Sequence, residues 1–181
     1  YQALVHVGSG AEYGPCDRPV AEDAPLNPTT DYGVAKAAAS LLCLAEARRG
    51  RPVVVVRLFG VYGPGEAAGR LAPSVMAACL RGEPARVTAG AQVRDFVFVQ
   101  DVVDLLKAPA HVPAPPGSVL HAAGGVGATV RRMVETIVEV AGGPPPLFGA
   151  VPSRSDEPPC YLAHIEKTTA LTGWKPRFSL R

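Results

Sequence analysis

The sequence has no long apolar run, little net charge and no closely paired cysteines. Its longest nearly apolar stretches, 37–45 and 52–56, are far shorter than the roughly 18 residues that a membrane span requires. The net charge is +2 and the arginines are scattered, so the basic patch of a nucleic-acid-binding protein is missing. These absences exclude a membrane span and disfavour a polynucleotide partner.

The cysteine and histidine positions argue against disulfides and metal sites. The four cysteines are far apart, with no Cys-x-x-Cys pair and no secretory signal segment before them. The four histidines lack metal-ligand spacing. We therefore expect free thiols in a reducing, cytoplasmic compartment and assign no metal.

What is present indicates a globular α/β chain. Its 181 residues are enough for one domain with a real core, and nineteen glycines and nineteen prolines are too few for a disordered or collagen-like chain. The apolar run 4–7 predicts a buried strand, and the continuous β-branched run 52–59 predicts a parallel strand covered on both faces. The other predicted elements are a nearly all-apolar helix over 31–49, helices over 73–81, from about 101, over 130–141 and over 165–172, and a strand over 93–99.

One side-chain pair points to proton-transfer chemistry. Tyr32 and Lys36 stand one turn apart on the same face of the predicted helix. A nearby ammonium favours the phenolate, so Tyr32 can exchange a proton with a hydroxyl or carbonyl group, as alcohol–ketone interconversion requires. Ser9 follows the end of a buried strand, where open α/β sheets present ligand-binding groups, and can donate to the same oxygen. The alternative is an ordinary exposed Tyr–Lys pair.

Several motifs in a fixed order give this pair a context. They run over nearly the whole chain: Gly-Ser-Gly-Ala-Glu-Tyr-Gly at 8–14, Glu22-Asp23, Pro28, Tyr-Gly-Val-Ala-Lys at 32–36, Arg-Leu-Phe-Gly-Val-Tyr-Gly-Pro-Gly at 57–65, and Arg-Asp-Phe-Val at 94–97. This set resembles the extended short-chain dehydrogenase/reductase family, and more narrowly its branch of sugar-nucleotide epimerases, dehydratases and 4-ketoreductases.

The resemblance implies roles for individual residues. Ser9 would hydrogen-bond the sugar oxygen, Tyr32 would be the acid/base, and Lys36 would bind the nicotinamide ribose of NAD or NADP. The remaining implied contacts are Phe59, Gly60 and Val61 beside the nicotinamide, Arg94 and Arg154 on the substrate diphosphate, and Arg70, Leu71, Val87 and Thr88 around the nucleotide. Members of this family also dimerise through the helix that runs here from Tyr32 to Arg49, which implies a homodimer.

The sequence departs from the family pattern in three places. Gly60 stands where members that bind UDP-sugars often carry an asparagine that contacts the phosphates. Gly10 and Ala11 stand where 4,6-dehydratases carry acidic residues, so dehydration is disfavoured. The glycine-rich dinucleotide turn that opens family members is not seen in this sequence, which predicts that the chain matches their C-terminal half.

These observations lead to one main prediction. Residues 1–64 form the C-terminal part of a Rossmann-like parallel sheet, and 65–181 form mainly a small α/β region that binds a nucleotide sugar, with some elements returning to the sheet. The complete enzyme is an NAD(P)-dependent epimerase or 4-ketoreductase acting at a hexose carbinol, and this chain alone is inactive. The alternatives are a non-catalytic fragment that binds a nucleotide sugar or serves in assembly, and a 4,6-dehydratase.

Overall fold

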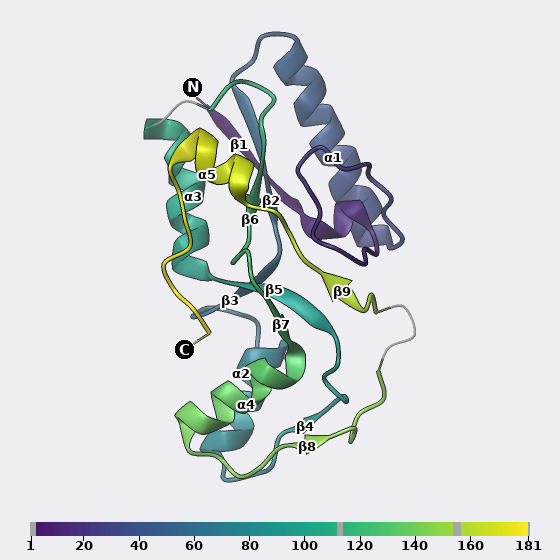
Figure 1. The fold of residues 1–181 in the computed structure, drawn as a ribbon, viewed down its shortest axis with the longest axis vertical. Helices are drawn as coiled ribbons and strands as arrows, with labels where there is room; N and C mark the ends of the chain where they lie inside the picture. Colours follow the sequence, from purple (N-terminus) through teal and green to yellow (C-terminus); the bar gives the residue numbers. More distant parts are fainter. Residues whose placement is uncertain (1–2, 112–113, 154–156, 181) are drawn as a thin grey trace.

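A three-stranded parallel sheet forms one half of the molecule. The computed structural model describes residues 3–111, 114–153 and 157–180. Strands β1 (Leu4–Ser9), β2 (Val53–Leu58) and β6 (Val119–Ala122) pair in the order β1-β2-β6. Figure 1 shows helix α1 (Asp31–Arg48) on one side of this sheet and helices α3 (Val99–His111) and α5 (Glu166–Thr172) on the other. The predicted α/β class with a parallel sheet is therefore confirmed.

The valine run explains why β2 lies in the middle. Its four valines, from Val53 to Val56, are at most 2% exposed, so the strand is covered on both faces as the continuous apolar pattern predicts. Val54 and Val56 pack in one cluster with Leu105 of α3, Leu120 of β6 and Trp174. This cluster is the core that holds the sheet against α3.

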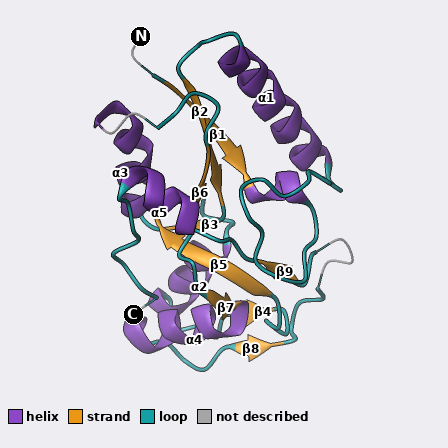
Figure 2. Ribbon diagram, turned by 45° about the horizontal axis from the view of Figure 1, so that its top comes forward, coloured by secondary structure: helices purple, strands orange, loops and turns teal. Residues whose placement is uncertain are grey.

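A second sheet and a helix pair form the other half. Strands β3 (Gly60–Tyr62), β5 (Val93–Phe98) and β7 (Gly127–Thr129) pair in that order, and β9 (Cys160–Tyr161) pairs with β5. Helices α2 (Leu71–Leu80) and α4 (Val130–Ala141) share an apolar cluster around Val75 and Val134, and β4 (Arg86–Val87) pairs with β8 (Leu147–Phe148) beside them. Figure 2 shows β5 between the first sheet and helix α4.

Most predicted elements are confirmed, and the differences are short elements. The loop after β1 begins with a 3-10 helix, η1 (Gly10–Tyr13), and β6 was not expected at all. The brief strands β3, β4, β7, β8 and β9 were likewise not predicted, because two or three residues carry no periodic signal.

Helix α1 begins where its sequence predicts. The Thr30 hydroxyl accepts a hydrogen bond from the Gly33 amide at 3.1 Å, which caps the first turn. The helix leaves Val34, Leu41 and Leu42 more than half exposed.

Among the described residues, no helix is both long and apolar enough to cross a membrane.

Candidate active site

The last residues of β1 turn alternate polar backbone groups to the side opposite β2, where no strand lies among the described residues. Leu4 donates its amide to the Pro52 carbonyl at 2.8 Å, and the alternation of a parallel ladder then points the amides and carbonyls of Val5, Val7 and Ser9 away from β2. Side chains bind two of these groups. Lys36 Nζ donates to the Val7 carbonyl at 3.1 Å, and the Ser9 amide donates to Glu12 Oε1 at 2.8 Å.

The Ser9 hydroxyl is oriented by the start of η1. Its oxygen accepts a hydrogen bond from the Ala11 amide at 3.2 Å, and Glu12 accepts from the Ser9 amide in return, which completes a capping box. Because the oxygen already accepts a hydrogen bond, the hydroxyl hydrogen remains for donation to another group. Ser9 is thus built as a donor at the end of β1.

Tyr32 and Lys36 reach the same corner from the first turns of α1. Lys36 Nζ lies 5.9 Å from the centre of the Tyr32 ring. Gly33 lies so close to the η1 backbone that a Cβ on it would stand 2.6 Å from the Ala11 carbonyl oxygen. The helix start therefore packs directly on the turn that holds Ser9. The Tyr32 side chain remains exposed, as a group that meets a ligand must be.

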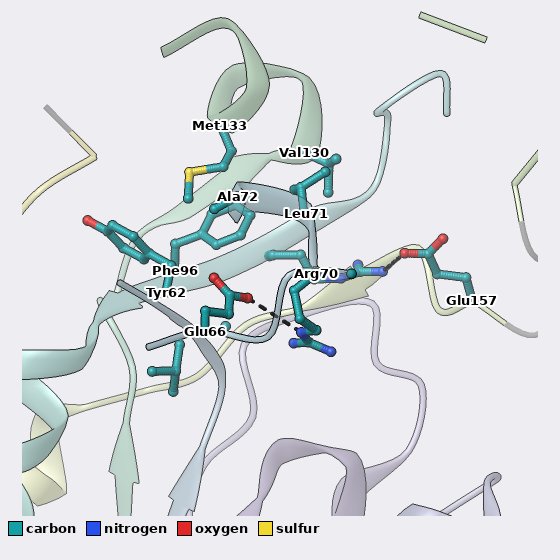
Figure 3. Close-up of a pocket in the computed structure, with 13 residues that line it drawn as sticks. Tyr62, Glu66, Arg70, Leu71, Ala72, Phe96, Val130, Met133 and Glu157 are labelled. Carbon is teal, nitrogen blue, oxygen red and sulfur yellow. Dashed lines mark hydrogen bonds and ion pairs between the residues drawn. The ribbon is translucent and has the colours of Figure 1, made fainter. Parts of the chain in front are cut away.

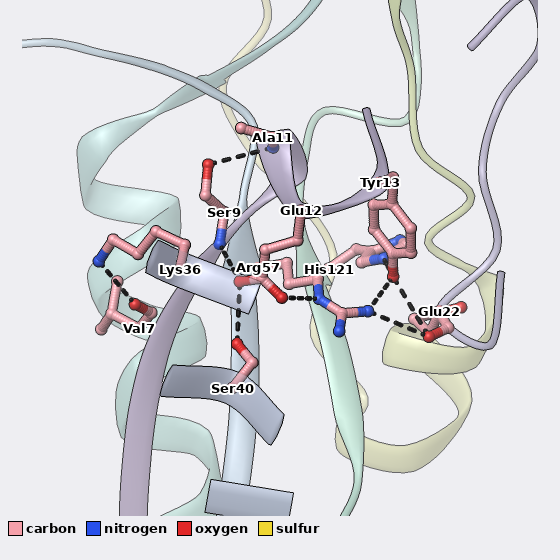
Figure 4. Close-up of polar contacts among 10 residues, drawn as sticks. All are labelled: Val7, Ser9, Ala11, Glu12, Tyr13, Glu22, Lys36, Ser40, Arg57 and His121. Atoms are coloured by element: carbon pink, nitrogen blue, oxygen red, sulfur yellow. Dashed lines mark hydrogen bonds and ion pairs between the residues drawn. The ribbon is translucent and has the colours of Figure 1, made fainter. Parts of the chain in front are cut away.

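A buried polar network lies beneath this corner, and sequence reasoning missed it (Figure 4). Arg57 of β2 donates through Nε to Glu12 Oε2 at 2.7 Å and through its terminal nitrogen to the Tyr13 hydroxyl. His121 Nδ1 lies 2.9 Å from the His164 carbonyl, which assigns the proton to Nδ1, so Nε2 accepts from the Tyr13 hydroxyl at 2.7 Å. The one available signal was Arg57, a charge directly after four buried valines.

Burial controls the titration of this network. Loss of solvent raises the pKa of Tyr13 to about 12, against the opposing effect of the Arg57 charge. Burial likewise lowers the pKa of His121 to about 4, so the imidazole is neutral at physiological pH and fits the assigned tautomer.

A cavity of about 340 Å³ gathers five of the predicted ligand-binding residues: Gly60, Val61, Arg70, Leu71 and Arg94. Phe59 links this cavity to the Ser9 turn, because a Cβ on Gly10 would stand 2.9 Å from the Phe59 ring. Two carboxylates that the sequence analysis did not single out share the cavity, as Figure 3 shows: Glu66 lies 3.4 Å from Arg70 Nε and Glu157 lies 2.7 Å from an Arg94 terminal nitrogen.

Two of the other predicted ligand residues, Val87 and Thr88, lie outside this cavity. Val87 is buried in the apolar cluster between α2 and α4, and neither it nor Thr88 lines the cavity of Arg70 and Arg94. Arg154 lies outside the described residues.

The close approach of β3 and β5 accounts for Gly60. A Cβ at this position would stand 2.7 Å from the Asp95 carbonyl oxygen, so no side chain fits without a shift of the backbone. The glycine that departs from the family pattern is therefore required by local packing.

The chain is similar to known proteins in sequence and in fold. Residues 1–116 match the model of the NAD dependent epimerase/dehydratase family. The chain is 33% identical to a dTDP-6-deoxy-L-talose 4-dehydrogenase (NAD(P)(+)) of Kitasatospora kifunensis, over 98% of this chain and 59% of that protein. It is 31% identical to a UDP-glucose 4-epimerase of Azospirillum brasilense, over 96% of this chain and 56% of that protein.

Solved structures of similar sequence share the fold of this chain. The structure of MoeE5 in complex with UDP-glucuronic acid and NAD superposes with a TM-score of 0.89 at 33% identity, over 98% of this chain and 60% of that one. The chain thus spans less than two thirds of the length of these relatives. That it matches their C-terminal half stays a prediction.

Proposed function

The chain belongs to the NAD-dependent epimerase/dehydratase family, and from that membership we propose that the complete enzyme is an NAD(P)-dependent epimerase or 4-ketoreductase acting on the hexose of a nucleotide sugar. One observation carries the proposal. Lys36 Nζ binds the carbonyl of Val7, two residues before Ser9, and lies 5.9 Å from the Tyr32 ring centre, while Phe59 lies against the Ser9 turn and directly precedes Gly60 of the cavity that holds Arg70 and Arg94.

Each residue at the corner has a chemical task. Ser9 donates its free hydroxyl hydrogen to the oxygen of the reacting carbon and holds it in place. Tyr32 gives a proton to that oxygen during reduction or takes one during oxidation. The Lys36 ammonium, 5.9 Å from the ring centre, favours the phenolate form that accepts the proton.

The residues present fit a nicotinamide dinucleotide. Lys36 Nζ donates one hydrogen to the Val7 carbonyl, and its other hydrogens suit the hydroxyl oxygens of a ribose. Gly60 and Val61 line the cavity and present little side-chain bulk to a flat ring. When bound, the dinucleotide supplies or accepts the hydride.

The arginine side chains support a diphosphate as the second ligand. Arg70 and Arg94 both line the cavity, and the planar guanidinium group matches phosphate oxygens bidentately. A nucleotide sugar would place its diphosphate there and its hexose toward Ser9 and Tyr32.

Dehydration receives no support from the site. Glu12 is the carboxylate nearest in sequence to Ser9, and it is fully buried and bonded to Arg57, so it cannot serve as an acid or base toward substrate. Gly10 and Ala11 supply no carboxylate. We therefore favour simple oxidation and reduction over water loss.

We also infer a homodimer and a cytoplasmic location. Val34, Leu41 and Leu42 leave an apolar face on α1 that a second copy can cover. All four cysteines are free thiols, which suits a reducing compartment. A monomeric mass by light scattering would refute the dimer.

The test is the variant Tyr32→Phe in the natural gene product that contains this chain. We expect kcat to fall by about 10² to 10⁴-fold, the usual contribution of a positioned acid/base group. Binding of UDP or dTDP, measured by calorimetry, should stay unchanged and show that the variant is folded. Activity within a few-fold of wild type would refute the proposal. If the natural product is this chain alone and binds neither NAD(H) nor NADP(H), the non-catalytic alternative is correct.

A further inference from the structure

Glu12 is a carboxylate with no exposure to solvent. Burial of a charged group is costly unless the charge is paired and its oxygens are hydrogen-bonded. Three donors surround this one: the Ser9 amide at 2.8 Å and the Ser40 hydroxyl at 2.9 Å on Oε1, and Arg57 Nε at 2.7 Å on Oε2. The side chain is thus completely engaged, and its position is tightly defined.

Stability alone does not explain a buried ion pair at this place. Replacing such a pair with apolar side chains of similar volume is often neutral or stabilising. Gly8 leaves room for this side chain, since a Cβ on Gly8 would stand 2.5 Å from Glu12 Oε1. An apolar side chain at position 12 would fill the space and could not accept the Ser9 amide.

The bond from the Ser9 amide connects this buried pair to the reactive corner. Ser9 N lies at the open edge of β1, where no strand among the described residues offers it a carbonyl. Glu12 takes that role, while the Ala11 amide binds Ser9 Oγ. The two bonds hold the backbone amide and the hydroxyl oxygen of Ser9, and Arg57 anchors Glu12 to the central strand β2.

We propose that Glu12 is a positioning residue for Ser9: it fixes the serine backbone so that the hydroxyl points at the substrate oxygen. This inference rests on the proposed function, in which Ser9 donates to the reacting oxygen. Glu12 touches neither substrate nor cofactor, so its removal lowers kcat and leaves KM nearly unchanged. A displacement of about 1 Å at a reacting group can cost about 10²-fold in rate.

The experiment is a double-mutant cycle of Glu12→Gln and Ser9→Ala in the natural gene product. In Glu12→Gln the guanidinium of Arg57 attracts the amide oxygen, which turns the NH₂ group toward the Ser9 amide and breaks that bond. We expect kcat to fall about 10 to 100-fold with KM within a few-fold of wild type. In the Ser9→Ala background the same change should have almost no further effect, because the proposed effect of Glu12 on the rate passes through the Ser9 hydroxyl.

A matched control separates positioning from general damage. Glu22 is also a buried carboxylate of the network, but its side chain bonds to Thr168 and not to Ser9. Glu22→Gln should therefore lose less than a few-fold in kcat. If Glu12→Gln does not fold, the double variant Glu12→Val/Arg57→Met removes the ion pair without leaving a buried charge, and the same kcat loss is expected.

The outcomes are distinct. A kcat at the wild-type level in either Glu12 variant overturns the inference, as does an equal loss with and without the Ser9 hydroxyl, since that would show a purely structural role. An equal loss in Glu22→Gln would overturn it as well. If Ser9→Ala alone leaves kcat unchanged, the proposed function of Ser9 fails instead.

Discussion

Asp95 should make the folded chain less stable as pH rises from about 4 to 7. Its side chain is 1% exposed and accepts hydrogen bonds from the amides of Gly124, Gly125 and Ala163. Burial outweighs these bonds and raises the pKa from 3.8 to about 6. Because its pKa is higher in the folded chain, the folded chain binds this proton more tightly than the unfolded chain does. The resulting stabilisation is complete below the unfolded pKa and is lost as pH rises through the folded pKa.

The size of the effect follows from the shift. A rise of about two units, at about 1.4 kcal/mol per unit, gives about 3 kcal/mol. The variant Asp95→Asn has nearly the same shape, keeps an oxygen for Gly124 and Gly125, and does not titrate. Its free energy of unfolding relative to the unsubstituted chain should therefore increase by about 3 kcal/mol between about pH 4 and pH 7.

Urea unfolding at a series of pH values, followed by far-UV circular dichroism, measures this difference. Comparing the two proteins at each pH cancels every other titrating group that they share. A difference that stays constant from pH 4 to pH 7, or that shrinks, would show that the buried carboxyl does not titrate near 6 and would refute the reasoning.

Three further outcomes are expected. His121→Gln should show the opposite trend. Burial lowers the pKa of His121 from 6.5 to about 4, so the stability that the neutral imidazole contributes is lost as pH falls. In the same urea assay, the free energy of unfolding of the variant should therefore rise by about 3 kcal/mol relative to the unsubstituted chain between about pH 6.5 and 4. Gly33→Ala should force α1 away from the η1 turn, since the new Cβ meets the Ala11 carbonyl, and should lower kcat while circular dichroism stays native; unchanged kinetics would contradict the packing. Arg94→Ala should weaken UDP or dTDP binding by about tenfold or more in calorimetry, and equal affinity would remove Arg94 from the site.

Local patterns predicted the elements whose signal is contained in their own residues. The continuous valines predicted β2, and the nearly all-apolar pattern of 31–49 predicted α1 to within one residue at each end. The spacing of Tyr32 and Lys36 placed both side chains on one face because helix geometry alone decides it.

Elements that depend on distant partners escaped prediction. β6 is four residues long, includes a histidine, and is a strand because Leu120 finds its register opposite Val56 of β2. The Glu12–Arg57 pair joins residues 45 positions apart, and no local pattern relates them. The burial of Val87 in the cluster around Val75 and Val134 also depends on residues far away in the sequence, and its role at the nucleotide stays a prediction.

The ion pairs in the cavity influence how strongly an anion can bind there. Arg70 and Arg94 already face Glu66 and Glu157, so the four charges sum to zero before any ligand arrives. A diphosphate that reaches these arginines must take the place of carboxylates, and its affinity is the difference between the new pairs and the old ones. The affinity of a diphosphate for this cavity should therefore vary less with ionic strength than its affinity for a cavity with unpaired arginines. The reason is that the cavity carries little net positive charge for salt to screen.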